Sequence, residues 1–229
     1  MNIIVNGGSR GIGKEVVLCL SQDTNNQIIV TGRNEMALES LSASSSNIHP
    51  VTSDLSIPYD LERTFTAKIL RHFKRVDLLI NMAGVLISKK FTDIDNREAR
   101  LMMETNFFGP ATVIRMLKPL LSKGSHILNI SSMGGYQGSV KFKGLSYYSA
   151  SKAAIACLSE CLAEEFKDSG ISVNCIALGA VQTEMLQEAF PGYKAPVEAR
   201  EIAPFISYFA LNGHKFMNGR IIPLAVNNP

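Results

Sequence analysis

Short runs of aliphatic and β-branched residues alternate with amphipathic segments along the whole 229-residue chain. Several of these runs are nearly continuous Ile, Val and Leu, which is typical of strands that are covered on both faces. The runs predict seven strands, at Asn2–Asn6, Gln27–Thr31, Asn47–Thr52, Val76–Asn81, Ser125–Ile130, Ile171–Ile176 and Arg220–Leu224. The amphipathic segments predict helices at Ile12–Ser21, Glu35–Ser42, Leu61–Phe73, Arg97–Leu121, Tyr148–Lys167 and Val197–Leu211.

Strands that alternate with helices indicate the α/β class, in a single domain over residues 1–229. We expect a Rossmann-type, doubly wound parallel sheet of about seven strands with helices on both faces. Ligands of such sheets bind beyond the carboxyl ends of the strands, at the point where the strand order reverses. The polar and glycine residues that follow each strand are therefore the first candidates for function.

Composition excludes several other classes of protein. The formal net charge is +3 and the basic residues are scattered, so no basic run indicates a nucleic-acid partner. The chain enters its first strand directly as MNIIVNGG, and no apolar run approaches the roughly 20 residues needed to span a bilayer. We therefore expect a cytoplasmic protein with no membrane partner.

The cysteines and histidines do not form a metal-binding pattern. Cys157 and Cys161 share a helical face, but no His or acidic partner accompanies them at ligand spacing. The four histidines are far apart in the chain. We predict no metal site, and interpret the cysteines as buried, reduced thiols.

A glycine-rich loop, NGGSRGIG at residues 6–13, follows the first predicted strand and opens the first helix. Gly7, Gly11 and Gly13 suit a tight turn, close approach of a pyrophosphate and close packing of helix on strand. The helix start offers unpaired N–H groups to phosphate. In this position the loop, with Ser9 and Ile12, predicts a dinucleotide site.

The charge after the second strand bears on the type of dinucleotide. A carboxylate there would bind the ribose 2′-hydroxyl of NAD, but the chain has Gly32 and Arg33, and Arg10 lies in the glycine loop. Two guanidinium groups suit a 2′-phosphate, although two ordinary surface arginines would give the same pattern. We predict NADP (NADPH) as the cofactor and regard NAD as the weaker alternative.

Two further strand ends carry candidate cofactor contacts. Asp54 and Leu55 follow the third strand and are placed to hold the adenine amino group. Asn81, Ala83 and Gly84 follow the fourth, where small residues let the backbone run close to a ribose.

Tyr148 and Lys152 are four residues apart in a predicted helix and share one of its faces. A nearby cation favours the phenolate form, so Lys152 is expected to lower the pKa of Tyr148 toward the range of an acid/base catalyst. Taken alone, the pair is more simply interpreted as an ordinary exposed helical pair, and the rest of the chain decides between the two. Ser132 ends the fifth strand, and Asn106 lies within a predicted helix, where Asn is mildly unfavourable.

In their order and spacing, the motifs described above, from the glycine loop to the Tyr148–Lys152 pair, resemble those of the short-chain dehydrogenase/reductase family. The resemblance covers roughly residues 2–223. The resemblance implies NAD(P) and interconversion of a carbonyl and an alcohol. It implies that Tyr148 is the general acid, that Lys152 also holds the nicotinamide ribose, and that Ser132 hydrogen-bonds the substrate oxygen. By the same resemblance Asn106 seats a relay water, and Val181 and Thr183 contact the nicotinamide carboxamide.

The chain also departs from the family pattern. Leu178 stands where a Pro usually precedes Gly179, which we expect to loosen the following loop, and the substrate lid between Thr183 and Ala195 is short. The substrate is expected to be a small carbonyl or alcohol compound, and the resemblance implies a homodimer or homotetramer. The alternatives are an NAD(P)-binding regulator on the same fold and a Rossmann-type methyltransferase.

Overall fold

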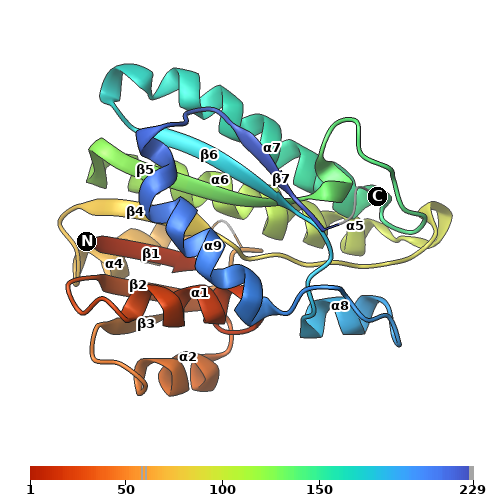
Figure 1. Ribbon diagram of the computed structural model, residues 1–229, viewed down its shortest axis with the longest axis horizontal. Helices are drawn as coiled ribbons and strands as arrows, with labels where there is room; N and C mark the ends of the chain where they lie inside the picture. The colour runs from red at the N-terminus through yellow and green to blue at the C-terminus, as the bar shows by residue number, and fades with distance from the viewer. Residues whose placement is uncertain (58, 60, 227–229) are drawn as a thin grey trace.

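A computed structural model describes residues 1–57, 59 and 61–226 of the chain. Its strands form one parallel sheet in the order β3-β2-β1-β4-β5-β6-β7, which confirms the predicted doubly wound architecture (Figure 1). The order reverses between β1 and β4, so a crevice is expected at the carboxyl ends of these strands. The strands are β1 Asn2–Asn6, β2 Gln27–Gly32, β3 Ile48–Thr52, β4 Val76–Asn81, β5 Leu121–Ser132, β6 Ser172–Leu178 and β7 Ile221–Leu224.

Helices cover both faces of the sheet, and this explains why its strands are almost continuously apolar. Within β1, Ile3 and Val5 face the core beneath α1 and α9, whereas Ile4 faces the core beneath α4, α6 and α7 (Figure 1). The helices are α1 Gly11–Ser21, α2 Glu35–Ser42, α4 Thr66–Leu70, α5 Asn96–Met103, α6 Gly109–Leu117, α7 Ser146–Glu165, α8 Glu184–Ala189 and α9 Ala199–Asn212. None of these helices is long and apolar enough to cross a membrane.

The long helix predicted over Arg97–Leu121 is divided in the structure. A π-helical turn, η3 at Glu104–Phe108, separates α5 from α6, and Leu121 already belongs to β5. Pro110 has no N–H to donate to the carbonyl group of Asn106, so regular α-helical hydrogen bonding fails at this point. The N–H of Gly109 instead reaches back five residues to the carbonyl of Glu104.

One other helix prediction needs correction, and one helix was not predicted. The segment predicted as a helix over Leu61–Phe73 is a π-helical turn, η1 at Leu61–Phe65, followed by α4, which ends at Leu70. The sequence analysis did not predict α8, which lies in the segment expected to be a short lid.

The prediction of buried thiols is correct for one cysteine only. Cys175 is buried in β6, Cys19 is half-buried, and Cys157 and Cys161 are exposed on α7. The four thiols are free.

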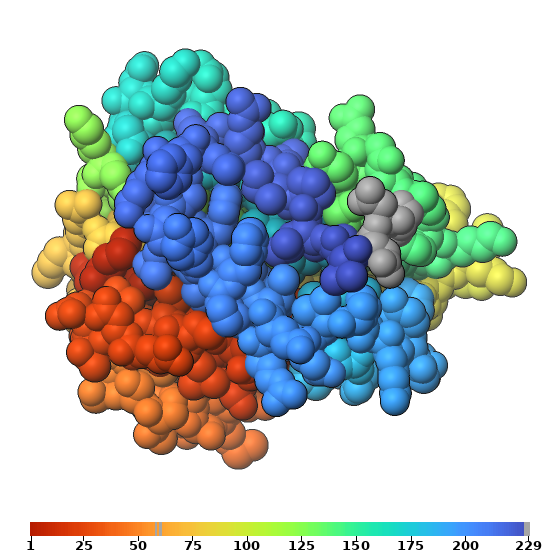
Figure 2. Space-filling model, in the orientation of Figure 1, coloured from red at the N-terminus to blue at the C-terminus, as the bar shows by residue number. Residues whose placement is uncertain are grey.

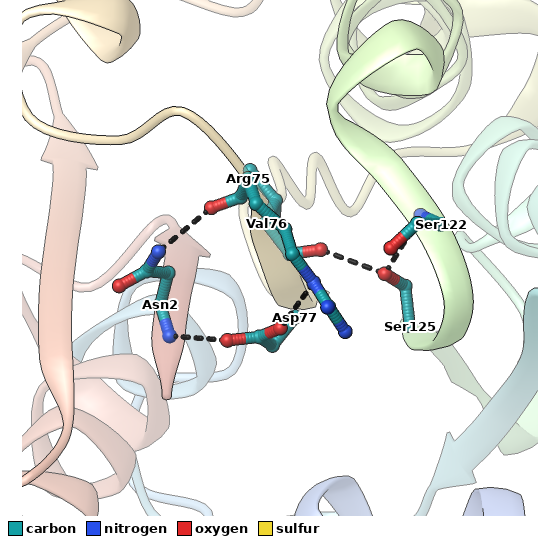
Figure 3. A network of polar contacts seen from close by, with 6 residues as sticks. All are labelled: Asn2, Arg75, Val76, Asp77, Ser122 and Ser125. Atoms are coloured by element: carbon teal, nitrogen blue, oxygen red, sulfur yellow. Dashed lines mark hydrogen bonds and ion pairs between the residues drawn. The ribbon is translucent and has the colours of Figure 1, made fainter.

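The pairing of β4 with β5 changes register near the amino ends of the strands, and polar side chains surround this point (Figure 3). The hydroxyl group of Ser125 donates to the carbonyl of Val76 at 2.7 Å, and the carboxylate of Asp77 accepts from the N–H of Asn2 at 2.8 Å. Arg75 pairs with the other oxygen of Asp77 at 2.8 Å. These side chains therefore provide partners for the carbonyl of Val76, at the register shift, and for the N–H of Asn2, at the start of β1.

A second network crosses the interior of the sheet at one register level near its carboxyl edge. Thr31 donates to Asn6 at 2.8 Å, Asn6 to Asn81 at 2.7 Å, and Asn81 to Asn129 at 2.8 Å. Asn129 donates in turn to Ser159 of α7 at 2.9 Å. All five side chains are buried, so the network links four strands to the helix that carries Tyr148 and Lys152.

Candidate active site

A cavity of about 670 Å³ lies at the carboxyl ends of the strands. Its walls come from the glycine loop, from the ends of β2, β4, β5 and β6, from the start of α7, and from the α8 segment and the residues after β7. In Figure 2 the α8 segment, residues 225–226 after β7 and the loop before α7 gather toward the right-hand end of the molecule. This is the crevice that the strand order predicts.

The glycine loop leaves room that side chains would remove. Gly7 has φ +85°, and a Cβ on it would lie 2.4 Å from the backbone nitrogen of Ala83. A Cβ on Gly13 would lie 2.1 Å from the carbonyl oxygen of Gly7, so α1 packs directly on the loop. Arg10 is the N-cap of α1 and its side chain accepts no hydrogen bond from the helix, so the first amide groups of α1, at the cavity wall, have no cap from this residue. These features fit the pyrophosphate of a dinucleotide.

Arg10, Arg33 and Asp54 line the cavity beyond the ends of β1, β2 and β3, which are neighbours in the sheet. The carboxylate of Asp54 accepts from the N–H and the hydroxyl of Ser56, at 2.9 and 2.7 Å, which fixes its orientation. Arg10 pairs with Glu188 of α8 at 3.2 Å, and both side chains are largely exposed. The two guanidinium groups that the sequence predicts as phosphate ligands therefore reach one cavity, and one of them also touches the lid.

Tyr148, Lys152 and Ser132 meet at the other end of the cavity. Ser132 is the last residue of β5, its hydroxyl accepts from the N–H of Gly134 at 3.2 Å, and it is close enough to the phenol of Tyr148 to affect its pKa. The Lys152 ammonium is buried and donates to the carbonyl oxygen of Ile130 at 2.9 Å. Gly135 lets α7 approach this strand end, since a Cβ there would lie 2.5 Å from the backbone of Lys152.

The electrostatics of this group differ from the prediction in one respect. Burial raises the pKa of Tyr148 above its usual 10.0, and the hydrogen bond from Ser132 opposes that effect. Burial lowers the pKa of Lys152 from 10.5 to about 8. The structure does not show the expected lowering of the pKa of Tyr148 by Lys152, because burial of the phenol raises this pKa and outweighs the opposing effect of Ser132.

Asn106 lies beneath the cavity in the π-helical turn, and its side chain does not line the cavity. Its amide oxygen accepts from the N–H of Val85 at 2.8 Å, and its amide nitrogen donates to the Val85 carbonyl and to the Ser151 hydroxyl, both at 2.9 Å. Ser151 donates to the carbonyl of Tyr148 at 2.7 Å. Asn106 therefore joins the segment after β4 to the helical turn that carries Tyr148.

Most of the predicted site residues line the cavity, and two do not. Asn81 and Asn106 are buried beneath its floor, with Asn81 held in the network that crosses the sheet. The predicted residues that line the cavity are Gly7, Ser9, Arg10, Gly11, Ile12, Gly13, Arg33, Asp54, Leu55, Ala83, Gly84, Ser132, Tyr148, Lys152, Val181 and Thr183.

Sequence reasoning missed much of the wall beyond Tyr148. Leu86, Leu145, Met185, Phe190 and Tyr193 line the cavity there. The helix α8 has only six residues, which are too few for a helical period to be recognised in the sequence.

The lid is anchored at both of its ends. Thr183 caps α8 by accepting from the N–H of Leu186 at 3.2 Å. Gln182 donates its N–H to the carbonyl of Val197 at 2.7 Å and accepts from the N–H of Ala195 at 2.8 Å. The ends of the lid are thus drawn together at Gln182, and the segment closes over the apolar part of the cavity.

Leu178 does not loosen the loop after β6, contrary to the expectation. It is the buried last residue of β6, in register with Ser132 on one side and Leu224 on the other. The following residue, Gly179, donates its N–H to the carbonyl of Leu224 at 2.9 Å. Because Leu178 packs in the core and the strand pairing continues through it, the loop starts from a fixed point.

Comparison with known proteins agrees with this geometry. The family model described as short chain dehydrogenase matches residues 1–194. The chain is 30% identical over 208 residues to an uncharacterized oxidoreductase of Staphylococcus epidermidis, covering 90% of this chain and 88% of that protein. It is 35% identical over 199 residues to dehydrogenase/reductase SDR family member 7B of Rattus norvegicus, covering 80% of this chain and 58% of that protein.

Solved structures show the same fold. A short chain dehydrogenase family protein from Francisella tularensis has a TM-score of 0.83 and 27% identity, over 97% of this chain and 96% of that chain. A short chain dehydrogenase from Burkholderia cenocepacia in complex with NADP has a TM-score of 0.84 and 21% identity, over 97% and 95% of the two chains. With the family match over most of its length, the chain belongs to the short-chain dehydrogenase/reductase family and is an oxidoreductase of that type.

Proposed function

We propose that this protein is an NADPH-preferring reductase that converts an aldehyde or ketone into an alcohol, and that residues 1–229 form its single catalytic domain. The observation that carries the proposal is the shared cavity. Tyr148, Lys152 and Ser132 meet at one end of it, and Arg10 and Arg33 lie at the other. Acid/base groups and phosphate-binding groups on one cavity are what a nicotinamide-dependent carbonyl reduction needs.

When bound, NADPH supplies the hydride that is added to the carbonyl carbon. Tyr148 donates a proton to the carbonyl oxygen, and its raised pKa keeps the phenol protonated near neutral pH, as a proton donor requires. Ser132 hydrogen-bonds the same oxygen, where negative charge develops. Ser132 and Tyr148 line the same cavity, and the effect of the Ser132 side chain on the pKa of Tyr148 shows that the two donors are close together.

Lys152 acts on the phenolate that Tyr148 becomes after it has given up its proton. With a pKa of about 8, the buried ammonium is mostly protonated near neutral pH. A cation in this poorly solvated position stabilises the new phenolate more strongly than an exposed one would. Lys152 would also hold the ribose hydroxyl groups of the nicotinamide half of the cofactor.

Asn106 supports the reaction from below the cavity. Its amide groups are used by Val85 and Ser151, so it positions the backbone around Tyr148. Its own carbonyl has no N–H partner at Pro110, since proline cannot donate. We assign the relay water to that carbonyl group, which leaves the side chain free for its structural contacts.

At the cofactor end, Arg10 and Arg33 would bind the 2′-phosphate, and the amides of α1 would bind the pyrophosphate. Asp54 and Leu55 would hold the adenine, and Ala83 and Gly84 the adjacent ribose. Val181 and Thr183 would contact the nicotinamide carboxamide.

The catalytic assignment is tested by a panel of aldehydes and ketones, with NADPH consumption followed by absorbance. Tyr148→Phe should abolish turnover and leave NADPH binding largely unchanged. Tyr147→Phe is the matched control, since Tyr147 is the preceding residue, stacks on Phe91 and does not line the cavity. Turnover retained by Tyr148→Phe would refute the assignment. NADPH binding by the unmodified protein without turnover of any carbonyl would favour a regulatory role.

The cofactor preference is tested by equilibrium binding of NADPH and NADH. Arg33→Ala should weaken NADPH binding about tenfold or more, the effect of losing a hydrogen bond between charged groups, and should leave NADH binding nearly unchanged. Arg71→Ala, at an exposed arginine outside the cavity lining, is the control. Equal affinity of the unmodified protein for both cofactors would refute the preference.

We also propose an oligomeric state for the protein. The outer faces of α5, α6 and α7 are proposed as the surfaces of a homodimer or homotetramer, and the exposed Phe108 lies beside α6. Light scattering combined with Phe108→Glu would test this, because a charge there should shift the protein toward monomer.

The proposed location is the cytoplasm. The free thiols on the surface of α7 suit such a reducing environment.

A further inference from the structure

The part of the cavity beyond Tyr148 is apolar almost throughout. Leu86, Leu145, Met185 and Phe190 line it, and the rings of Phe142 and Tyr193 are about half exposed at its rim. Walls of this kind favour an apolar substrate body, because burying its surface releases water from both partners.

One charged side chain interrupts this apolar wall. The charged residues that line the cavity are Arg10, Arg33, Asp54, Lys143, Lys152 and Glu184. The first three belong to the cofactor end, and the Glu184 carboxylate lies beside Gly11 of the glycine loop. Lys152 belongs to the catalytic group. Among the described residues, Lys143 is therefore the charge that remains for the substrate.

The backbone around Lys143 is fixed, although its side chain is exposed. The carbonyl of Gly144 accepts from the N–H of Lys89 at 3.1 Å, and Gly144 has φ +85°, which favours glycine at this turn. The N–H of Leu145 donates to the carbonyl of Phe142 at 3.3 Å. Lys143 thus occupies a defined place on the wall, five positions before Tyr148 in the chain.

The ammonium of Lys143 has no hydrogen bond or ion pair with the described part of the chain. The neighbouring Lys141 differs in this respect, because its ammonium donates to the carbonyl of Tyr136 at 2.6 Å and to the hydroxyl of Ser139 at 2.9 Å. Lys141 also does not line the cavity. Of these two lysines in one loop, only Lys143 is placed to meet a ligand.

We propose that the substrate is an apolar aldehyde or ketone that carries an anionic group, a carboxylate or a phosphate, at a distance from its carbonyl, and that Lys143 binds this group. The inference rests on the proposed reductase function and narrows its substrate class. A cation at the rim of an apolar wall favours the anionic substrate over a neutral one of the same shape. With the anionic group bound by Lys143, the carbonyl group of the substrate is left to interact with Tyr148 and Ser132.

The test compares kcat/KM for three aldehydes of similar shape with NADPH: 4-carboxybenzaldehyde, its neutral methyl ester and 4-formylphenyl phosphate. The unmodified protein should prefer the anionic compounds by about fivefold, the effect of a largely exposed ion pair. The two anions distinguish a carboxylate from a phosphate subsite. Lys143→Gln should abolish the preference, Lys143→Arg should keep it, and Lys141→Gln should leave it unchanged. A preference that Lys143→Gln retains, or equal rates for all three compounds, would overturn the proposal.

A binding measurement separates this inference from the proposed function. Calorimetry with 4-(hydroxymethyl)benzoate and its methyl ester needs no turnover. If no aldehyde is reduced but the benzoate binds more tightly than the ester in a Lys143-dependent way, the reductase function fails and the anion subsite stands. If aldehydes are reduced without discrimination and the two ligands bind equally, the reductase function stands and the anion subsite fails.

Discussion

Replacing Lys152 with methionine should abolish activity. The same substitution should remove a contribution to the free energy of unfolding that is unfavourable at neutral pH and changes with pH. Methionine has a similar length and no charge. The Lys152 side chain is 4% exposed, so its ammonium is desolvated in the folded state and hydrated in the unfolded state. The residue therefore opposes folding while it serves the proposed chemistry.

The size of this effect follows from the pKa of the lysine. Burial lowers it from 10.5 to about 8, which corresponds to about 3 kcal/mol against folding near neutral pH. Between about pH 8 and pH 10.5, Lys152 is protonated to a greater extent in the unfolded chain than in the folded one. The free energy of unfolding therefore rises with pH over this range. From about pH 7 to about pH 9 the gain is about 1 kcal/mol. Loss of the hydrogen bond to Ile130 partly offsets the benefit of the substitution, by about 1–3 kcal/mol.

The assay is urea unfolding of the wild type and of Lys152→Met at about pH 7 and about pH 9, with NADPH turnover measured in parallel. The free energy of unfolding of the wild type should rise relative to the variant by about 1 kcal/mol over this range. Cys175 acts in the opposite sense above about pH 9, since burial raises its pKa from 9.0 to about 12, so the comparison stops at about pH 9. A difference between the two proteins that does not change with pH would refute the reasoning.

Three further outcomes are expected. Burial lowers the pKa of His126 from 6.5 to about 4, so the unfolded chain binds more protons between these values and stability should fall as the pH is lowered from 6.5 to 4; His126→Gln should flatten this dependence in denaturant unfolding, and an unchanged slope would contradict it. Asn129→Ala should destabilise the protein by about 2–4 kcal/mol, because it leaves buried partners on both sides unsatisfied, and a urea midpoint equal to wild type would contradict this. Glu188→Gln should free Arg10 and tighten NADPH binding up to about fivefold while NADH binding stays the same; weaker NADPH binding would show that the ion pair helps to hold the cofactor.

Much of the candidate site was predictable because a parallel sheet brings distant segments to one edge. The glycine loop, Arg33, Asp54 and Ser132 each follow a predicted strand, and the observed strand order places them around one cavity. The proximity of Tyr148 and Lys152 could be predicted from their four-residue spacing in one helix. Local periodicity and topology are enough for such residues, since neither depends on the details of packing.

The roles of Asn81 and Asn106 were not predictable in the same way. Both follow family-like patterns, yet the structure engages their side chains with buried polar partners beneath the cavity. Which amide points into the cavity and which into the core depends on register across four strands and on the π-helical turn before Pro110. The sequence pattern specifies neither.

The sequence by itself determined the class of fold, the succession of its strands and, apart from α8 and the π-helical turns, of its helices, and the position of a dinucleotide loop and a Tyr–Lys pair. These features depend on local periodicity and on residues close together in the chain. Tertiary structure alone decided the ionisation of that pair, since the pKa values of Tyr148 and Lys152 follow from their burial. It also decided that α8 closes the apolar wall and that Lys143 stands on its rim. Desolvation and the shape of a cavity arise from atoms brought together by the whole fold, and no local pattern contains them.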